Sequence, residues 1–132
     1  MQMFSQNPAA AYRRVALEAR IEASGSAELT RICLEEAHAA LGQALRAVER
    51  PLPGHSEALA GFSPVYRDPL SRAQTILLWL ARSVAPGHPL GASLTAFYGG
   101  LAGQISANCL QADAQSIAQI QSDIRELLEA AG

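Results

Sequence analysis

The sequence predicts an all-α fold, an antiparallel four-helix bundle with an additional short N-terminal helix. Apolar residues recur every three or four positions along four long segments, which is the period of an amphipathic helix. β-branched residues are scattered, and no segment shows the alternation typical of a strand. With 132 residues, 49% of them hydrophobic and 17% charged, the chain suffices for one core and is too short for two ordinary domains. We therefore expect a single domain over residues 1–132.

The first two helices are expected over residues 9–23 and 27–49. Ser24-Gly25-Ser26 separates them, because Gly25 suits the left-handed end of one helix and Ser26 can cap the next. The second helix has two apolar stripes, which predicts contact with more than one neighbour. The stripes are Leu34, Leu41, Leu45 and Val48, and then Leu29, Ile32 and Cys33.

Three more helices are expected after a loop that runs from residue 51 to about 68. Asp68-Pro69 is a start signal for the third helix, which should end near Val84 before Pro86-Gly87-His88-Pro89. The fourth should cover residues 90–111, and Asp113 can cap the fifth. The apolar stripes of these helices are Leu70, Ala73, Leu77, Leu80 and Val84; Leu90, Leu94, Phe97, Leu101 and Ile105; and Ile117, Ile120, Ile124 and Leu127. Trp79 and Phe97 are expected to have core roles.

Residues that could carry chemistry are few. Glu35-x-x-His38 has the spacing of a di-metal site in a helix bundle, but such a site needs a second pair, and neither His55 nor His88 supplies one. No nucleophile elbow or phosphate loop is present. We therefore expect a non-enzymatic protein with no metal and no cofactor. The glycines of Gly99-Gly100-Leu101-Ala102-Gly103 predict close approach of another helix, from this chain or from a partner.

Charge and segment lengths narrow the function further. The formal net charge of −2 offers no basic surplus for binding nucleic acid. The longest strongly apolar run, Thr75–Ala81, is far shorter than the roughly 20 residues of a membrane span, and the N-terminal residues show no signal-peptide pattern. Two cysteines cannot form a disulfide framework. These features predict a cytoplasmic protein without nucleic-acid binding or membrane insertion.

Five short pieces, in order along the chain, resemble the flagellin-specific export chaperone family, FliS. They are Ala11-Tyr12; Ser26-Ala27-Glu28-Leu29 with Ile32 to Glu35; Arg72-Ala73-Gln74-x-Ile76-Leu77; Leu94-x-x-Phe97-Tyr98; and Ala107-Asn108-x-Leu110-x-x-Asp113. Leu34 and Glu36 stand where the family has Tyr and Gly, and Gly103 and Gln104 stand roughly where it has an Arg pair.

The resemblance implies a cytoplasmic chaperone that binds the disordered C-terminal segment of flagellin. It would prevent premature polymerisation and aid delivery to the export apparatus, with an export-gate component as a further partner. A monomer or weak homodimer is expected. The partner-binding candidates are Tyr12 and Val15 as an N-terminal contact, Ile32, Leu77 and Leu101 as groove lining, and Arg72 and Gln74 as polar contacts or as supports of the bundle.

We expect the N-terminal segment, residues 1–25, to be mobile and to dock on an apolar groove until a client helix competes for it. The helix expected over residues 9–23 is near the ~12–15 residues at which isolated helices become marginal. The alternative from another class is a non-enzymatic, all-α regulatory or self-associating bundle with a different protein client.

Overall fold

A computed structural model of the protein describes residues 26–50 and 63–131. The chain divides into two compact units, Met1–Ile32 and Cys33–Gly132. Of the first unit, only residues 26–32 are described, and they form the first turns of a helix. The helix expected over residues 9–23, its Tyr12 and Val15, and most of the loop expected after residue 50 lie outside the described residues.

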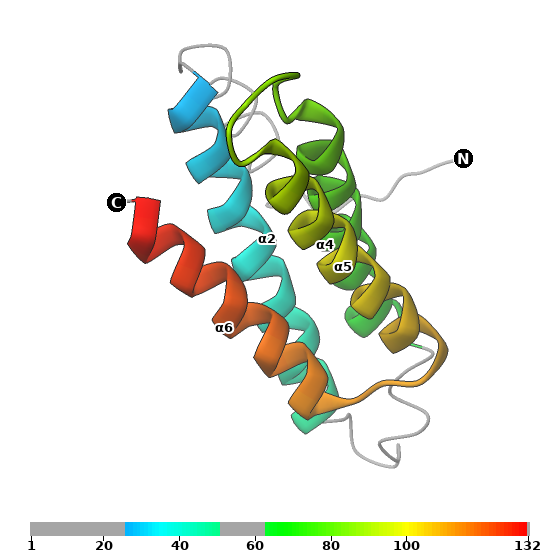
Figure 1. Ribbon diagram of the computed structural model, residues 1–132. Helices are drawn as coiled ribbons and strands as arrows, with labels where there is room; N and C mark the ends of the chain where they lie inside the picture. Colours follow the sequence, from blue (N-terminus) through cyan, green and yellow to red (C-terminus); the bar gives the residue numbers. More distant parts are fainter. Residues whose placement is uncertain (1–25, 51–62, 132) are drawn as a thin grey trace, which may run out of the picture. The chain divides into compact units, whose positions relative to one another are not determined.

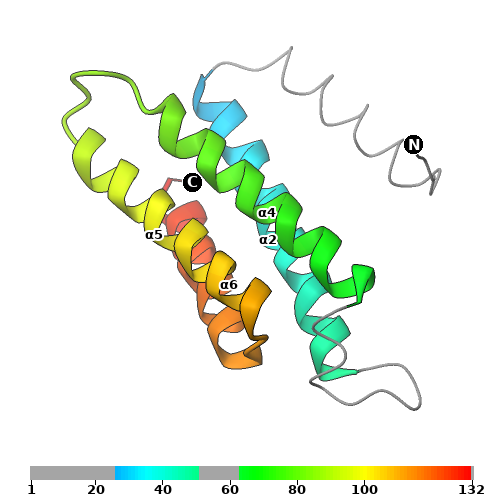
Figure 2. The same ribbon diagram turned by 90° about the vertical axis from the view of Figure 1, so that its right-hand side faces the viewer.

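The described residues form helices and no strands, which confirms the predicted all-α bundle. The helices are α2 (Ser26–Glu49), α4 (Pro64–Ser83), α5 (Gly91–Leu110) and α6 (Ala114–Ala131). In the second unit, which contains α2 from Cys33 onward, each helix runs opposite to the preceding labelled one (Figure 1; Figure 2). Helix α5 packs against α4 and α6, and hydrogen bonds join α2 to α4 and to α6.

Helix α4 begins earlier than predicted, at Pro64 rather than near Asp68. The Ser63 hydroxyl accepts a hydrogen bond from the Val65 backbone N–H at 3.2 Å, and Pro64 occupies the first turn, where its missing N–H has little consequence. Ser63-Pro64 therefore provides the same start chemistry as Asp68-Pro69, one helical turn upstream. The extension brings Tyr66 into the core, where its side chain is fully buried.

The predicted cap of the last helix is confirmed. Asp113 Oδ1 accepts hydrogen bonds from the backbone N–H groups of Gln115 and Ser116, at 3.0 and 3.3 Å. These two N–H groups have no acceptor within the first turn of a helix, so the carboxylate satisfies both. Helix α6 therefore begins where local sequence chemistry places it.

The core consists mainly of the predicted stripes. In the second unit its fully buried large side chains are Leu34, Leu41, Val48, Tyr66, Leu70, Leu77, Leu101, Ile105, Ile117, Ile120 and Ile124. Ile32, in the first unit, is also buried. Trp79 departs from the prediction, because 40% of its surface is exposed on the outer side of α4. Phe97 and Leu127 are half-buried, and Val84 lies just beyond the last residue of α4.

Among the helices that the structure describes, none combines the length and the apolar character required to cross a lipid bilayer.

Candidate docking site

An apolar groove lies between α5 and α6 in the second unit. Its volume is about 400 Å³, and it is lined by Leu90, Ser93, Leu94, Phe97, Asp123, Glu126 and Leu127. The apolar side chains come from both walls, whereas both charged side chains come from α6. A groove of this kind suits a partner that presents an apolar helix face.

The floor of the groove belongs to the same α5 stripe that enters the core. Leu94 and Phe97 are half-buried, whereas Leu101, one turn further along, is 2% exposed. The Phe97 ring meets Tyr98 edge to face, with centroids 5.9 Å apart and planes inclined by 64°. Tyr98 itself is buried, and burial, followed by the charge of Cys33, raises its pKa.

Leu90 lines the groove and is unusual for its position. It is the N-cap residue of α5, its side chain makes no capping hydrogen bond, and 60% of its surface is exposed. N-cap positions strongly favour Ser, Thr, Asp or Asn, whose oxygens accept from the first helical N–H groups. A large exposed apolar residue there contributes to the groove rather than to the helix terminus.

The charges of the groove lie on the α6 side. Asp123 Oδ1 accepts a hydrogen bond from the Gln119 side-chain amide at 2.9 Å, which orients the carboxylate. Glu126, three residues later on the same face, is exposed. Helix α5 contains no charged residue at all. One wall is therefore neutral and the other is acidic.

Arg125 belongs to the opposite side of α6, where it contacts α2. Its Nη2 lies 3.2 Å from His38 Nε2, and the His38 carbonyl accepts from Gln121 Nε2 at 3.2 Å. Burial, and then the positive charge of Arg125, lower the pKa of His38. A neutral imidazole can accept the arginine's N–H, so this contact favours uncharged His38.

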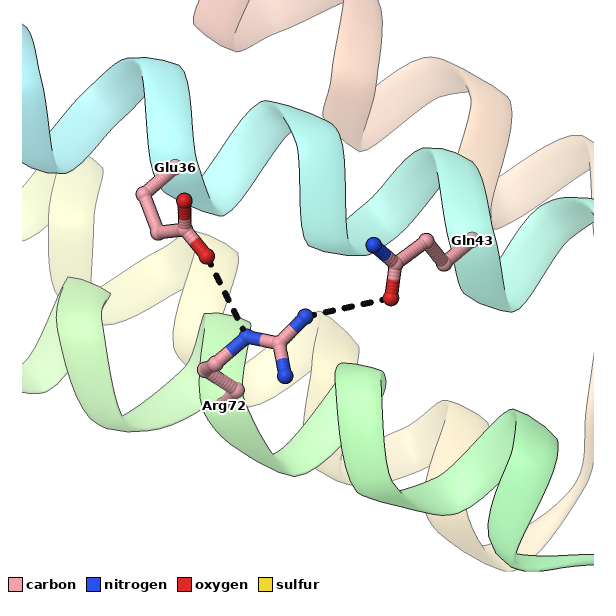
Figure 3. A network of polar contacts seen from close by, with 3 residues as sticks. All are labelled: Glu36, Gln43 and Arg72. Atoms are coloured by element: carbon pink, nitrogen blue, oxygen red, sulfur yellow. Dashed lines mark hydrogen bonds and ion pairs between the residues drawn. The ribbon is translucent and has the colours of Figure 1, made fainter. Parts of the chain in front are cut away.

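Of the residues predicted to bind a partner, Arg72 joins two helices of the bundle (Figure 3). Its Nη2 donates to Gln43 Oε1 at 3.1 Å, and its Nε lies 3.4 Å from Glu36 Oε2 as an ion pair without hydrogen-bond alignment. Both partners of Arg72 lie on α2. These contacts correspond to the supporting role that the sequence left open for Arg72.

Gln74 has the equivalent place on the other side of α4. Its side-chain amide donates to the Ala102 carbonyl at 3.3 Å and to the Ser106 hydroxyl. Both acceptors lie on α5. Arg72 and Gln74 thus connect α4 to its two neighbours.

The residues proposed as groove lining, Ile32, Leu77 and Leu101, are all buried. In the described part of the chain none of the three lines an open surface, so contact with a client would require the side chains that cover them to move. Their role in binding stays a prediction. The open groove instead uses Leu94 and Phe97. Both fall on the same predicted stripe as Leu101, but neither was predicted to line a groove.

Asn108 organises the connection between α5 and α6. Its Nδ2 donates to the Gln104 carbonyl and the Ser116 hydroxyl, at 3.0 and 2.9 Å, and its Oδ1 accepts from the Asp113 N–H at 2.8 Å. The Tyr66 hydroxyl donates to the Asn108 carbonyl at 2.7 Å. The sequence singled out Asn108 only as part of a resemblance, whereas Asp113 was also predicted to cap the last helix. Their hydrogen bonds give that piece a structural role in the bundle.

The three glycines in the middle of α5 are exposed. Gly99, Gly100 and Gly103 have no atom of the described residues within 4 Å of the position that a Cβ would occupy. The packing partner expected for these glycines is therefore not found among those residues.

In the residues that the structure describes, no group of three His, Cys, Asp or Glu side chains could hold a metal ion. Cys33 and Cys109 are both free thiols, and burial raises the pKa of Cys33. His38, the histidine of the Glu35-x-x-His38 pair, contacts Arg125 instead of a second metal ligand.

A scan of protein-family models finds no match to this chain, and a search of curated proteins finds no similar sequence.

Proposed function

We propose that this chain is a cytoplasmic flagellar secretion chaperone that binds the disordered C-terminal segment of flagellin. In this role it prevents premature polymerisation and aids delivery to the export apparatus. The groove between α5 and α6 is the observation that carries the proposal, because a helical bundle with an open apolar groove can accept a client helix. The resemblance of five sequence pieces to FliS carries the choice of flagellin as client.

Two of those pieces have structural roles that fit a bundle built on the same plan. Gln74 joins α4 to α5, and Asn108 organises the connection from α5 to α6. Leu94 and Phe97, from a third piece, line the groove. The resemblance therefore covers both supports of the bundle and the candidate docking surface.

Calorimetric titration of the full chain with a peptide of the flagellin C-terminal segment tests the proposal. Removing an exposed leucine from the groove should weaken binding, since each apolar side chain buried against a partner contributes roughly 1.5–3 kcal/mol. We expect Leu90→Ala to reduce the affinity at least about tenfold. Leu90 is already largely exposed, so the fold should tolerate the change.

Leu110→Ala is the matched control. Leu110 is the last residue of α5, is 88% exposed and does not line the groove. We expect this variant to bind the flagellin peptide as the unchanged chain does. Absence of binding to the unchanged chain would refute the proposed function, and equal losses in both leucine variants would refute the assignment of the groove.

A further inference from the structure

The distribution of charge in the groove indicates the chemistry of its occupant. We infer that the groove takes an amphipathic helix that carries a basic side chain beside its apolar row, on the edge that faces α6. This inference rests on the proposed function in so far as both require a client in the groove. It goes further because it specifies the client's charge and orientation.

The two walls of the groove differ in charge, and this difference favours one orientation of a bound helix. From α5 come Leu90, Ser93, Leu94 and Phe97, none of them charged, and from α6 come Asp123, Glu126 and Leu127. No Arg or Lys is among these lining residues. An acidic side chain of a client would thus meet like charge at α6, which is unfavourable, whereas a basic one would meet opposite charge.

The two carboxylates are placed to act together. Asp123 and Glu126 are three residues apart on one helix, so their Cβ atoms lie on the same face at roughly 5–6 Å. Asp123 Oδ1 already accepts from Gln119, and a carboxylate has two oxygens that accept several hydrogen bonds. An arginine or lysine held over Leu127 would have both carboxylates within reach of its side chain.

Leu90 and Leu127 provide apolar contacts for a bound helix. Leu90 is exposed at the N-cap of α5, and Leu127 is the apolar neighbour of Glu126 on α6. A client helix with an apolar row can cover them while its flank carries the basic residue. The apolar row supplies affinity, and the acidic edge selects which flank faces α6.

The ion pairs form at a solvent-exposed rim, so the preference they produce is modest and depends on salt. Replacing a basic flank by an acidic one converts attraction into repulsion at two carboxylates. We expect a roughly tenfold preference for the basic flank at an ionic strength of about 0.05 M, shrinking to roughly twofold at about 0.5 M.

Two synthetic peptides of about 18 residues test the inference, since this length forms about five helical turns. They share one row of leucines at helical spacing and differ only in a flank of either arginines or glutamates. Fluorescence anisotropy with the full chain measures both affinities. The result that supports the inference is the tenfold preference for the arginine peptide, together with its loss in the double variant Asp123→Asn, Glu126→Gln.

Glu129→Gln is the matched control, because Glu129 is an exposed carboxylate on α6 that does not line the groove. This variant should keep the full preference for the arginine peptide. The inference is overturned if neither peptide binds, if both bind equally, or if the preference persists in the double variant. The amide introduced by Asp123→Asn retains an oxygen that can accept from Gln119, so the double variant should keep the local fold.

The flagellin peptide separates this inference from the proposed function. If flagellin binding depends on Leu90 but not on Asp123 and Glu126, the proposed function stands and the charge inference is wrong. If the double variant removes the preference between the synthetic peptides but the flagellin peptide does not bind, the inference stands and flagellin is the wrong client.

Discussion

Replacing Tyr66 by Phe isolates a single buried hydrogen bond between two helices. The Tyr66 hydroxyl donates to the Asn108 carbonyl at 2.7 Å, and the Tyr66 side chain has no exposed surface. Asn108 lies in the last turn of α5, where carbonyls lack helical partners, so the hydroxyl satisfies a group that is otherwise difficult to pair. Phe keeps the ring and leaves no large cavity.

The loss of stability expected for Tyr66→Phe follows from the buried Asn108 carbonyl, which loses its donor. A typical internal hydrogen bond contributes about 1 kcal/mol net, and a buried acceptor left without a donor costs about 1–3 kcal/mol. We therefore expect Tyr66→Phe to lower the free energy of unfolding by about 1–3 kcal/mol. That is a substantial part of the roughly 5–15 kcal/mol typical of a domain.

The same residue predicts a dependence on alkaline pH. The pKa of Tyr66 is raised to about 12, chiefly by burial and then by Cys109 and Asp113, against the opposing charge of Arg67. A pKa above the unfolded value of 10 means that the folded state keeps its proton longer. The resulting stability is fully present below pH 10 and is lost as the pH rises from 10 to about 12. At about 1.4 kcal/mol per pKa unit, the loss is at most about 2–3 kcal/mol.

Urea unfolding of the unchanged chain and of Tyr66→Phe, at neutral and at alkaline pH, measures both effects. Tyr98→Phe is the control at neutral pH, because Tyr98 is also buried but its hydroxyl makes no hydrogen bond to the described residues. The stability gap between the unchanged chain and Tyr66→Phe should narrow above pH 10. A loss for Tyr66→Phe no larger than that for Tyr98→Phe would contradict a stabilising hydrogen bond from Tyr66 to Asn108.

Three further substitutions test other features by unfolding. The lowered pKa of His38 predicts stability that is full above pH 6.5 and falls below it, so His38→Gln should flatten the pH dependence of urea unfolding under weakly acidic conditions; an unchanged slope would contradict the lowered pKa. Gly100→Ala should raise the free energy of unfolding by about 0.5–1 kcal/mol, and a loss would reveal an atom packed against Gly100. Leu90→Ser should add about 0.5–2 kcal/mol through a new cap, and an unchanged Tm would argue against a deficient cap.

The parts of the fold predicted most accurately are those that depend on nearby residues. Apolar spacing identified the helices because a helix must bury one face, and Asp113 identified the start of α6 because its carboxylate reaches the next N–H groups. The start of α4 was misplaced because Ser63-Pro64 and Asp68-Pro69 are both good start signals. The contact of Tyr66 with Asn108, 42 residues away, is present only with the earlier start.

The candidate site was harder to predict because it depends on where one helix ceases to cover another. Leu94, Phe97 and Leu101 fall on one stripe, and spacing alone treats them alike. In the structure Leu101 is buried between helices, whereas Leu94 and Phe97 reach the groove. Trp79 was wrongly expected in the core for a related reason. A residue at the edge of a wide apolar stripe is buried only where a neighbouring helix covers that edge.

Leu90 was the local signal that could have found the groove. Leu90 was predicted as the first residue of the fourth helix and of its apolar stripe, whereas the structure makes it the N-cap, where a capping oxygen is preferred. A residue that opposes the local rule indicates a competing requirement, and such conflicts concentrate at functional sites. A helix start at Gly91 instead of Leu90 would have predicted an exposed apolar residue at this end.

Two features lower the stability of α5, one at its N-terminus and one in its middle, and they differ in their expected effect on docking. Leu90 lacks capping chemistry, and Gly100 lowers helix propensity, so Leu90→Ser and Gly100→Ala should both stabilise the chain. Leu90 lines a groove with further apolar residues and two carboxylates, so its replacement should weaken docking as it strengthens the helix. Nothing among the described residues lies against Gly100, and the glycines alone identify no partner. The gain in stability is therefore expected at both positions, whereas the loss of docking is expected only for Leu90.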